Sequence, residues 1–135
     1  MLAGANARSA VVRGCNLLED NPRFNAGTGS VLQSDGQIRM SAALMDGSAQ
    51  KFSGVINVAR VKNPIDLAAT LQAEFDRVLS DYGAAELARE LQLPIYNPLT
   101  QIRLEEWLQE RDENFPKKSQ KLPKNITIYS CSHNG

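Results

Sequence analysis

The feature that most constrains the fold is the abrupt end of a helical pattern at Asp20-Asn-Pro22. Residues 3–19 contain no proline, and their small and apolar residues recur at helical spacing, which indicates a helix. This helix ends before Pro22, because the residue that precedes a proline is pushed out of the α region. No capping box marks its start, so we expect the chain to begin inside a helix.

Beyond Pro22, glycines and β-branched residues replace the helical pattern. Phe24-Asn-Ala-Gly-Thr-Gly29, here called the glycine loop, precedes two short runs, 31–33 and 37–45, that are separated by Ser34-Asp-Gly36. Asp-Gly readily adopts the positive φ of hairpin turns, so these runs predict two paired strands. Residues 53–62 are rich in valine and isoleucine, and they predict a third strand.

The second half of the chain predicts helices. Asn63 as cap and Pro64 as first residue open a helix that we expect to end at Gly83. Two further helices are predicted over 84–91 and 99–111. From residue 114 lysines alternate with prolines, which predicts a linker or disordered tail over 114–135; within it Ile126–Tyr129 is β-prone, but the sequence reveals no strand that it could pair with.

Composition excludes several classes of protein. The 135 residues include 15 basic and 15 acidic side chains, so no net field draws the chain to nucleic acid or to a membrane surface. No apolar run approaches the roughly 20 residues of a membrane-spanning helix, and the first ten residues do not resemble a secretory signal, so we expect a cytoplasmic protein. Cys15 and Cys131 lie far apart without a CxxC pattern, which argues against a zinc site or a redox pair.

Few residues suggest chemistry by themselves. The glycine loop is either a structural turn or a loop whose carbonyl oxygens converge on a ligand or ion. Asn25 within it offers an amide, for which a local turn hydrogen bond is the simplest role. Asp46 follows a predicted strand and precedes a glycine, where an active-site group and a turn residue are both reasonable. His133 is the only histidine and lies in the predicted tail, so we assign it no role.

Four blocks resemble the α subunit of plant-type L-asparaginase/isoaspartyl peptidase in order and spacing. They are Leu17-Leu-Glu-Asp-Asn-Pro-Arg-Phe-Asn-Ala-Gly-Thr-Gly-Ser-Val31, Met40-Ser-Ala-Ala-Leu-Met-Asp-Gly47, Ser53-Gly-Val55 and Val61-Lys-Asn-Pro-Ile65. The first block is the most specific, and the resemblance covers roughly residues 5–113. We therefore expect a partial α-subunit core over 1–113. It lacks the first strand and the His-Gly-Gly-Ala-Gly motif with which chains of this family begin.

The resemblance implies an α+β fold that belongs to the N-terminal-nucleophile hydrolases. Chains of this kind form a four-layer αββα sandwich, with helices packed on a mainly antiparallel sheet. One precursor cleaves itself between Gly and Thr, and an end at Gly135 suits such a cut. The resulting α and β subunits stay together, and two pairs form an (αβ)2 assembly. The new N-terminal Thr of β attacks L-asparagine or a β-aspartyl dipeptide, with its own amine as the base.

The resemblance also assigns roles to residues. Asn25 would support the surroundings of the nucleophile. Main-chain oxygens would hold a structural sodium ion, and no other cofactor is implied; these oxygens belong to Leu18, Glu19, Asn21, Phe24, Ala26 and Thr28. The nucleophile, the oxyanion-hole donors and the substrate-binding Arg and Asp belong to the β subunit, so we expect this chain alone to be inactive and to bind no substrate.

An alternative from another class is a non-catalytic truncated remnant, or small binding module, of the same ancestry. Its unpaired sheet edges and exposed apolar helix faces would make it aggregate or stay loosely folded.

Overall fold

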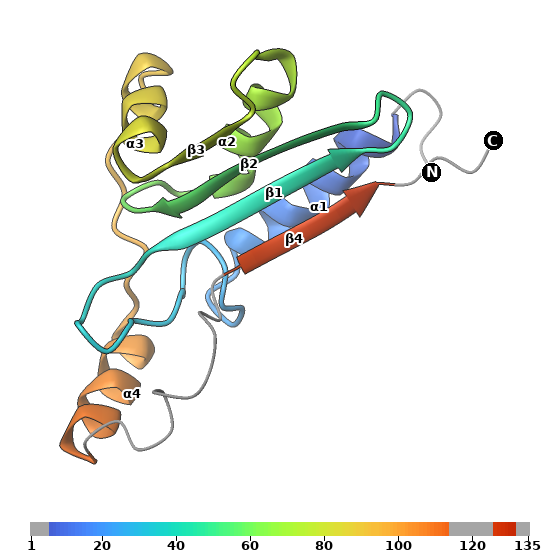
Figure 1. Ribbon diagram of the computed structural model, residues 1–135. Coiled ribbons are helices and arrows are strands. Elements are labelled where there is room, and N and C mark those ends of the chain that lie inside the picture. The colour runs from blue at the N-terminus through green and yellow to red at the C-terminus, as the bar shows by residue number, and fades with distance from the viewer. Residues whose placement is uncertain (1–5, 114–125, 132–135) are drawn as a thin grey trace.

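The computed structural model describes residues 6–113 and 126–131 (Figure 1). Its helices are α1 (Ala7–Glu19), α2 (Pro64–Thr70), the single 3-10 turn η1 (Leu71–Ala73), α3 (Asp81–Glu90) and α4 (Gln101–Asp112). Its strands are β1 (Met40–Asp46), β2 (Lys51–Val58), β3 (Val78–Ser80) and β4 (Ile126–Cys131). Helices and strands are thus both present, as the expected α+β class requires.

The described strands form one sheet in the order β3-β2-β1-β4. β1 and β2 are antiparallel, with Leu44 opposite Ser53 and Asp46 opposite Lys51. β4 pairs with β1, and β3 pairs with β2, in the parallel direction. The prediction of a mainly antiparallel sheet is therefore wrong for the described residues, which form a mixed sheet. The reason is that α2 and η1 carry the chain back across the sheet before β3, and such a crossover makes the next strand parallel.

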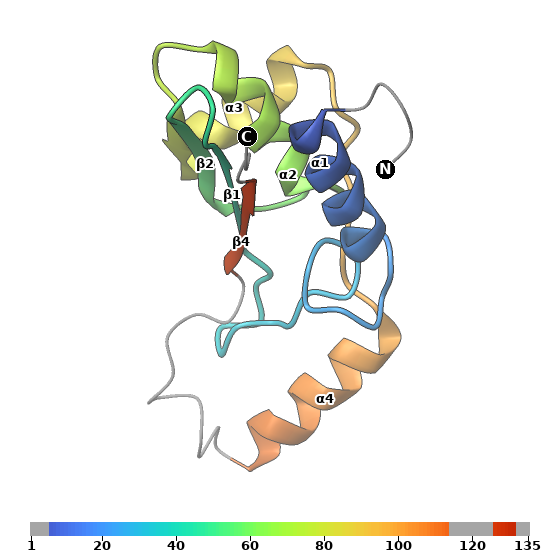
Figure 2. The ribbon, with the colours of Figure 1, turned by 90° about the vertical axis from the view of Figure 1, so that its right-hand side faces the viewer.

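Helices cover one face of this sheet, so the described core has two layers (Figure 2). Leu44 and Val55 of the sheet pack with Ile65, Leu67 and Leu71, all of them completely or almost completely buried. The other face bears side chains that alternate with these along the strands. Here Met45, Phe52, Ile56 and Val78 are 36%, 49%, 52% and 48% exposed. We call this surface, defined by those four residues, the open sheet face.

The first helix has a clear start, contrary to the expectation from sequence. The side chain of Asn6 accepts a hydrogen bond from the backbone N–H of Ser9 at 2.8 Å, as an N-cap does. Asparagine caps a helix as well as serine does, and a search restricted to capping boxes misses it. The helical pattern itself is confirmed over Ala7–Glu19.

The predicted turn is confirmed, and the second predicted strand, 37–45, corresponds to β1 from Met40 onward, whereas the first, 31–33, is not a strand. Gly36, at φ +78°, closes a tight turn in which the N–H of Gln33 bonds to the carbonyl of Gln37 at 2.8 Å. Residues 31–33 do not join the sheet, because the N–H of Val31 bonds to the side chain of Asn25 and the carbonyl of Gln33 accepts a bond from Trp107. The hairpin of the sheet is β1–β2, one turn further along the chain. The third predicted strand, 53–62, is β2 and ends at Val58.

The long helix predicted from Pro64 to Gly83 is wrong beyond Ala73. Residues 78–80 are instead β3, and the next helix begins at Asp81 and includes Gly83. Pairing with β2 accounts for the change, since Val78 lies opposite Gly54 and the N–H of Gly54 bonds to the carbonyl of Arg77 at 2.8 Å. Tertiary contacts override helix propensity here.

The later predictions differ by small shifts in the bounds. The helix predicted over 84–91 is the second half of α3, and the one over 99–111 is α4, capped by the hydroxyl of Thr100. The β-prone residues Ile126–Tyr129 belong to β4, for which β1 is the partner. The prediction of a linker or disordered tail otherwise falls on 114–125 and 132–135, which lie outside the described residues, as does His133.

Candidate functional site

The glycine loop lies directly after α1, and short backbone hydrogen bonds hold the chain on both sides of it. The N–H of Phe24 bonds to the carbonyl of Asn21 at 3.1 Å, which closes a turn around Pro22. The N–H of Thr28 then bonds to the carbonyl of Glu19 at 2.7 Å, which returns the loop to the end of α1. The loop is therefore a closed, hydrogen-bonded unit.

Two glycines make this path possible. Gly27 has φ +54°, and a Cβ there would lie 2.4 Å from the carbonyl oxygen of Glu19. Gly29 has φ +91°, and a Cβ there would lie 2.4 Å from the carbonyl oxygen of Pro22. Both positions need a left-handed backbone and a close approach, which only glycine provides without strain.

Glu19 joins the loop to the start of α2. Its side chain is 1% exposed, and its Oε1 accepts a hydrogen bond from the N–H of Ile65 at 3.1 Å. Burial raises the pKa of this carboxyl to about 8. Asn63 stands at the N-cap position of α2, as predicted, but its side chain does not cap the helix. Its amide donates to Asp20 at 3.1 Å, and the carboxyl of Glu19 takes its place at the helix start. Asp20 also pairs with Lys62 at 2.9 Å, and these two hydrogen bonds lower the pKa of Asp20.

Asn25 uses its side chain within the loop region. Its Oδ1 accepts a hydrogen bond from the backbone N–H of Val31 at 2.8 Å. The local role that the sequence suggested for this amide is thus confirmed. The bond fixes the orientation of the amide relative to the backbone that leaves the glycine loop.

The six main-chain oxygens named for sodium all belong to this unit. The carbonyls of Leu18, Glu19 and Asn21 already accept backbone hydrogen bonds, of 3.2, 2.7 and 3.1 Å. A carbonyl oxygen has two lone pairs, so such a bond leaves each oxygen able to ligate a hard cation. Backbone oxygens are the relevant donors, because the described residues contain no cluster of three or more His, Cys, Asp or Glu that could hold a metal.

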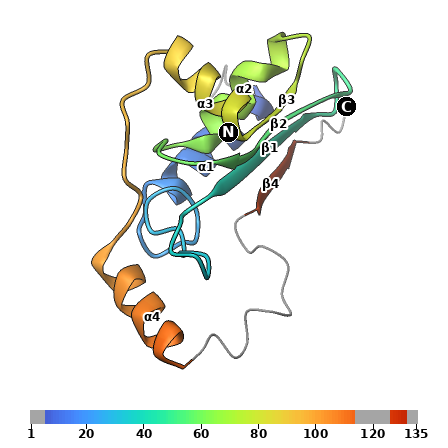
Figure 3. The ribbon, with the colours of Figure 1, turned by 60° about the vertical axis from the view of Figure 1, so that its left-hand side comes forward.

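Residues 96–107, here called the outer segment, cover the glycine loop from the side away from α1 (Figure 3). The N–H of Gly29 bonds to the carbonyl of Pro98 at 2.9 Å, and the hydroxyls of Thr28 and Tyr96 lie 2.9 Å apart. From α4, Arg103 Nε donates to the carbonyl of Gly29 at 2.8 Å. These contacts were not foreseen. No motif in the sequence marks Arg103 or Trp107.

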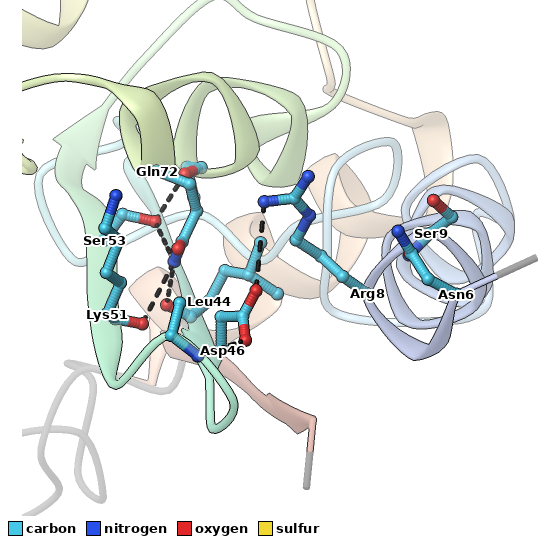
Figure 4. Close-up of polar contacts among 10 residues, drawn as sticks. Asn6, Arg8, Ser9, Leu44, Asp46, Lys51, Ser53 and Gln72 are labelled. Atoms are coloured by element: carbon cyan, nitrogen blue, oxygen red, sulfur yellow. Dashed lines mark hydrogen bonds and ion pairs between the residues drawn. The ribbon is translucent and has the colours of Figure 1, made fainter. Parts of the chain in front are cut away.

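Asp46, the other carboxylate that the sequence singled out, lies at the opposite end of β1 and serves a turn. Its Oδ1 accepts the N–H of Ala49 at 3.1 Å, and its Oδ2 lies 3.9 Å from Arg8 (Figure 4). Nearby, the amide of the buried Gln72 donates to the carbonyl of Leu44 and to the hydroxyl of Ser53, both at 2.9 Å. Gln72 thereby ties η1 to the hairpin, and the structure does not bring Asp46 to the glycine loop.

Cys15 is buried in the core beside the sheet. Among the described residues, no helix is long and apolar enough to cross a membrane.

Comparison with known proteins gives one consistent result. The sequence profile of the asparaginase family matches residues 1–133. An isoaspartyl peptidase/L-asparaginase from a Nostoc species is 73% identical over 115 residues, which are 85% of this chain and 36% of that protein. A protein of the same name from a Synechocystis species is 63% identical over 95% of this chain and 39% of its own length. A plant-type L-asparaginase from Pyrococcus horikoshii is 44% identical over 78% of this chain and 35% of its own length.

The chain thus spans well under half the length of these relatives. The residues that match the family include the glycine loop and the described strands. The resemblance that four short blocks suggested extends over nearly the whole sequence. The chain belongs to the asparaginase family.

Proposed function

We propose that this chain is the α-subunit portion of an isoaspartyl peptidase/L-asparaginase, which hydrolyses β-aspartyl dipeptides and L-asparagine. The observation that carries the proposal is the 73% identity with the Nostoc protein of that name. The glycine loop supports it, because the most specific block of the resemblance lies in a closed unit that two glycines make possible.

In the proposed reaction a β subunit supplies the N-terminal Thr. Its hydroxyl attacks the amide carbon, and its amine accepts the hydroxyl proton. The C–N bond of the resulting tetrahedral intermediate then breaks, ammonia or the amino acid leaves with that proton, and water hydrolyses the acyl-enzyme ester that remains. This chain contributes Asn25, with an amide orientation that the N–H of Val31 holds at 2.8 Å. Asn25 would support the surroundings of the nucleophile, and the chain alone would be inactive.

The open sheet face supports a partner layer. Met45, Phe52, Ile56 and Val78 expose apolar area on a sheet whose other face is covered by helices. A second sheet packed there would bury these side chains and complete an αββα sandwich. The β subunit would supply that sheet, and two αβ pairs would form the (αβ)2 assembly.

A structural sodium ion at the glycine loop is part of the proposal. The donors would be the main-chain oxygens of Leu18, Glu19, Asn21, Phe24, Ala26 and Thr28, and hard oxygen ligands of this kind suit an alkali cation. The test is the midpoint of thermal unfolding in sodium, potassium and choline chlorides at equal ionic strength. Sodium alone should raise it, and equal midpoints in the three salts would count against the ion.

The decisive experiment joins this chain to the rest of a relative. A chimera carries residues 1–113 of this chain in place of the matching region of the Nostoc protein, with the remainder of that protein unchanged. Release of ammonia from L-asparagine, and of aspartate from a β-aspartyl dipeptide, is measured for the chimera and for this chain alone. We expect activity only in the chimera, and Asn25→Ala should lower it at least tenfold. Hydrolysis by this chain alone would refute the placement of the nucleophile.

The remnant alternative predicts a different outcome. A chimera that unfolds as cooperatively as the Nostoc protein but hydrolyses neither substrate would favour a non-catalytic remnant or binding module. The open sheet face also supports this alternative, because an exposed apolar face is typical of a fragment that binds another protein.

A further inference from the structure

The outer segment makes its closest contacts with the chain that carries Asn25. Both backbone groups of Gly29 are hydrogen-bonded to this segment. Its N–H donates to the carbonyl of Pro98 at 2.9 Å, and its carbonyl accepts a hydrogen bond from Arg103 Nε at 2.8 Å. The indole N–H of Trp107 donates to the carbonyl of Gln33 at 2.8 Å. Gly29 and Gln33 flank Val31, which holds the side chain of Asn25.

Arg103 is itself held in place. Its side chain is 18% exposed, and its Nη1 pairs with Glu106 Oε2 at 2.7 Å, one turn further along α4. Its Nη2 lies 3.5 Å from the carbonyl of Arg23, at the other end of the glycine loop. The guanidinium thus spans the loop from Arg23 to Gly29, a span for which its planar set of donors is suited.

α4 buries none of its residues in the core. Its contacts with the loop region are polar bonds to backbone carbonyls, together with the Trp107 ring, from which a Cβ on Gly36 would lie 3.3 Å away. α4 thus adds little to the core but bonds to the carbonyls of Arg23, Gly29 and Gln33. Its main structural effect is therefore on the glycine loop and the residues that follow it.

The geometry points to Arg103 as a positioning residue that fixes the glycine loop and, through Gly29 and Val31, the orientation of the Asn25 amide. Trp107 fixes the chain that follows the glycine loop, through its hydrogen bond to the carbonyl of Gln33. The consequence for catalysis rests on the proposed function, whereas the effect on the loop does not.

The first test measures amide hydrogen exchange in the full 135-residue chain. Arg103→Met should speed exchange at the N–H groups of Thr28, Ser30 and Val31 by about 10- to 100-fold, the factor expected when a hydrogen bond to a charged group is lost. Exchange in β1 and β2 should not change. Arg103→Lys should restore part of the protection, and Arg89→Met, which removes an exposed arginine with a comparable i,i+3 pair on α3, is the matched control.

Trp107→Phe is the second variant, since it keeps an aromatic ring at this position and removes the N–H donor to Gln33, together with the indole atoms that lie nearest Gly36. It should speed exchange at residues 31–37 without affecting the sheet. Unchanged exchange of the loop in both Arg103→Met and Trp107→Phe would overturn the proposal. So would an equal rise over the loop and the sheet, because that result would mean a general loss of stability.

The second test uses the active chimera. Arg103→Met should lower kcat about tenfold or more with KM nearly unchanged, and Arg103→Lys should recover part of kcat. Slower turnover without faster exchange of the loop would refute the positioning role. Faster exchange in the chain, together with a chimera that is inactive even with Arg103 intact, would uphold the positioning role and reject the proposed function.

Discussion

Glu19 destabilises the fold at this loop, because its carboxyl is buried. The carboxyl is buried between the end of α1 and the start of α2, where one oxygen accepts the N–H of Ile65 and Oε2 has no partner in the described structure. Burial of a charged carboxylate with so few hydrogen bonds is unfavourable. This penalty on the charged form raises the pKa of Glu19 to about 8.

The raised pKa predicts the pH dependence of stability. Below the unfolded value of 4.5 both states are protonated; between 4.5 and about 8 only the folded state holds the proton; above 8 both are ionised. The free energy of unfolding should therefore fall as pH rises from 4.5 to 8, by roughly 5 kcal/mol at most at 1.4 kcal/mol per pH unit. Glu19→Gln should flatten this dependence and stabilise the protein at pH 8. Urea unfolding from pH 5 to 8.5 in sodium-free buffer measures it.

Asp20→Asn is the matched control for that measurement. Asp20 is adjacent to Glu19 but about half exposed, and its pKa is lowered by hydrogen bonds from Lys62 and Asn63, so it is ionised in both states above pH 5. Its replacement should leave most of the slope in place, because burial is the main cause that raises the pKa of Glu19 and repulsion by Asp20 is a minor one. The same pH slope in Glu19→Gln and in the original protein would contradict the burial of a costly carboxyl.

The two kinds of glycine in this chain predict opposite effects of alanine. Gly27→Ala places a methyl group 2.4 Å from the Glu19 carbonyl at a positive φ, so it should destabilise the protein by about 2–5 kcal/mol. Gly14 lies within α1 with no neighbouring atom within 4 Å of an added Cβ, so Gly14→Ala should stabilise by about 0.5–1 kcal/mol. The midpoint of thermal unfolding of each variant, compared with that of the original protein, tests both predictions. Destabilisation of similar size in both variants would refute the requirement for glycine at position 27.

At the scale of elements, Gln72 determines how η1 meets the hairpin. Its Nε2 donates to the carbonyls of Leu44 and Lys51 and to the hydroxyl of Ser53, which in turn donates to the carbonyl of Ala68 at 2.5 Å. Gln72→Leu should destabilise by about 1–3 kcal/mol, because these bonds are lost inside the core.

Gln101→Leu is the control for Gln72→Leu, since the exposed Gln101 bonds only to Glu105 on its own helix among the contacts described. Its effect on the denaturant midpoint should be within about 0.5 kcal/mol. If the two leucine variants unfold at the same midpoint, the network around Gln72 adds nothing to stability.

The elements show where sequence patterns succeed. α1 and α4 were predicted nearly correctly, because apolar spacing and proline act within a few residues. β3 was missed, because three residues of strand inside a helix-prone run are visible only through their pairing with β2. The tight turn at Gly36 was predicted, yet Asn25 and Trp107 take the hydrogen bonds that would have made residues 31–33 a strand.

At the scale of the whole molecule, the open sheet face is an apolar surface that a partner layer could cover. Full burial of a side chain such as Ile56 contributes about 1.5–3 kcal/mol, so binding of such a layer would be favourable. In the isolated chain, Ile56→Lys should reduce self-association in size-exclusion chromatography with light scattering and change stability by only about 0.5 kcal/mol. In the chimera the same change should impair assembly. Ile95→Lys, at a site 83% exposed outside the sheet, should do neither. Normal assembly of the Ile56→Lys chimera would refute a layer on this face.

The sequence by itself determined what depends on neighbours along the chain: the end of α1 before Pro22, the turn at Gly36, the glycine loop and the family to which its residues belong. Only the tertiary structure decided which groups complete that loop. Glu19 rather than Asn63 satisfies the start of α2, and Arg103, 74 positions away from Gly29, satisfies its carbonyl. A buried donor or acceptor needs a partner wherever the fold can bring one, and contacts between distant segments leave no periodic pattern in a sequence.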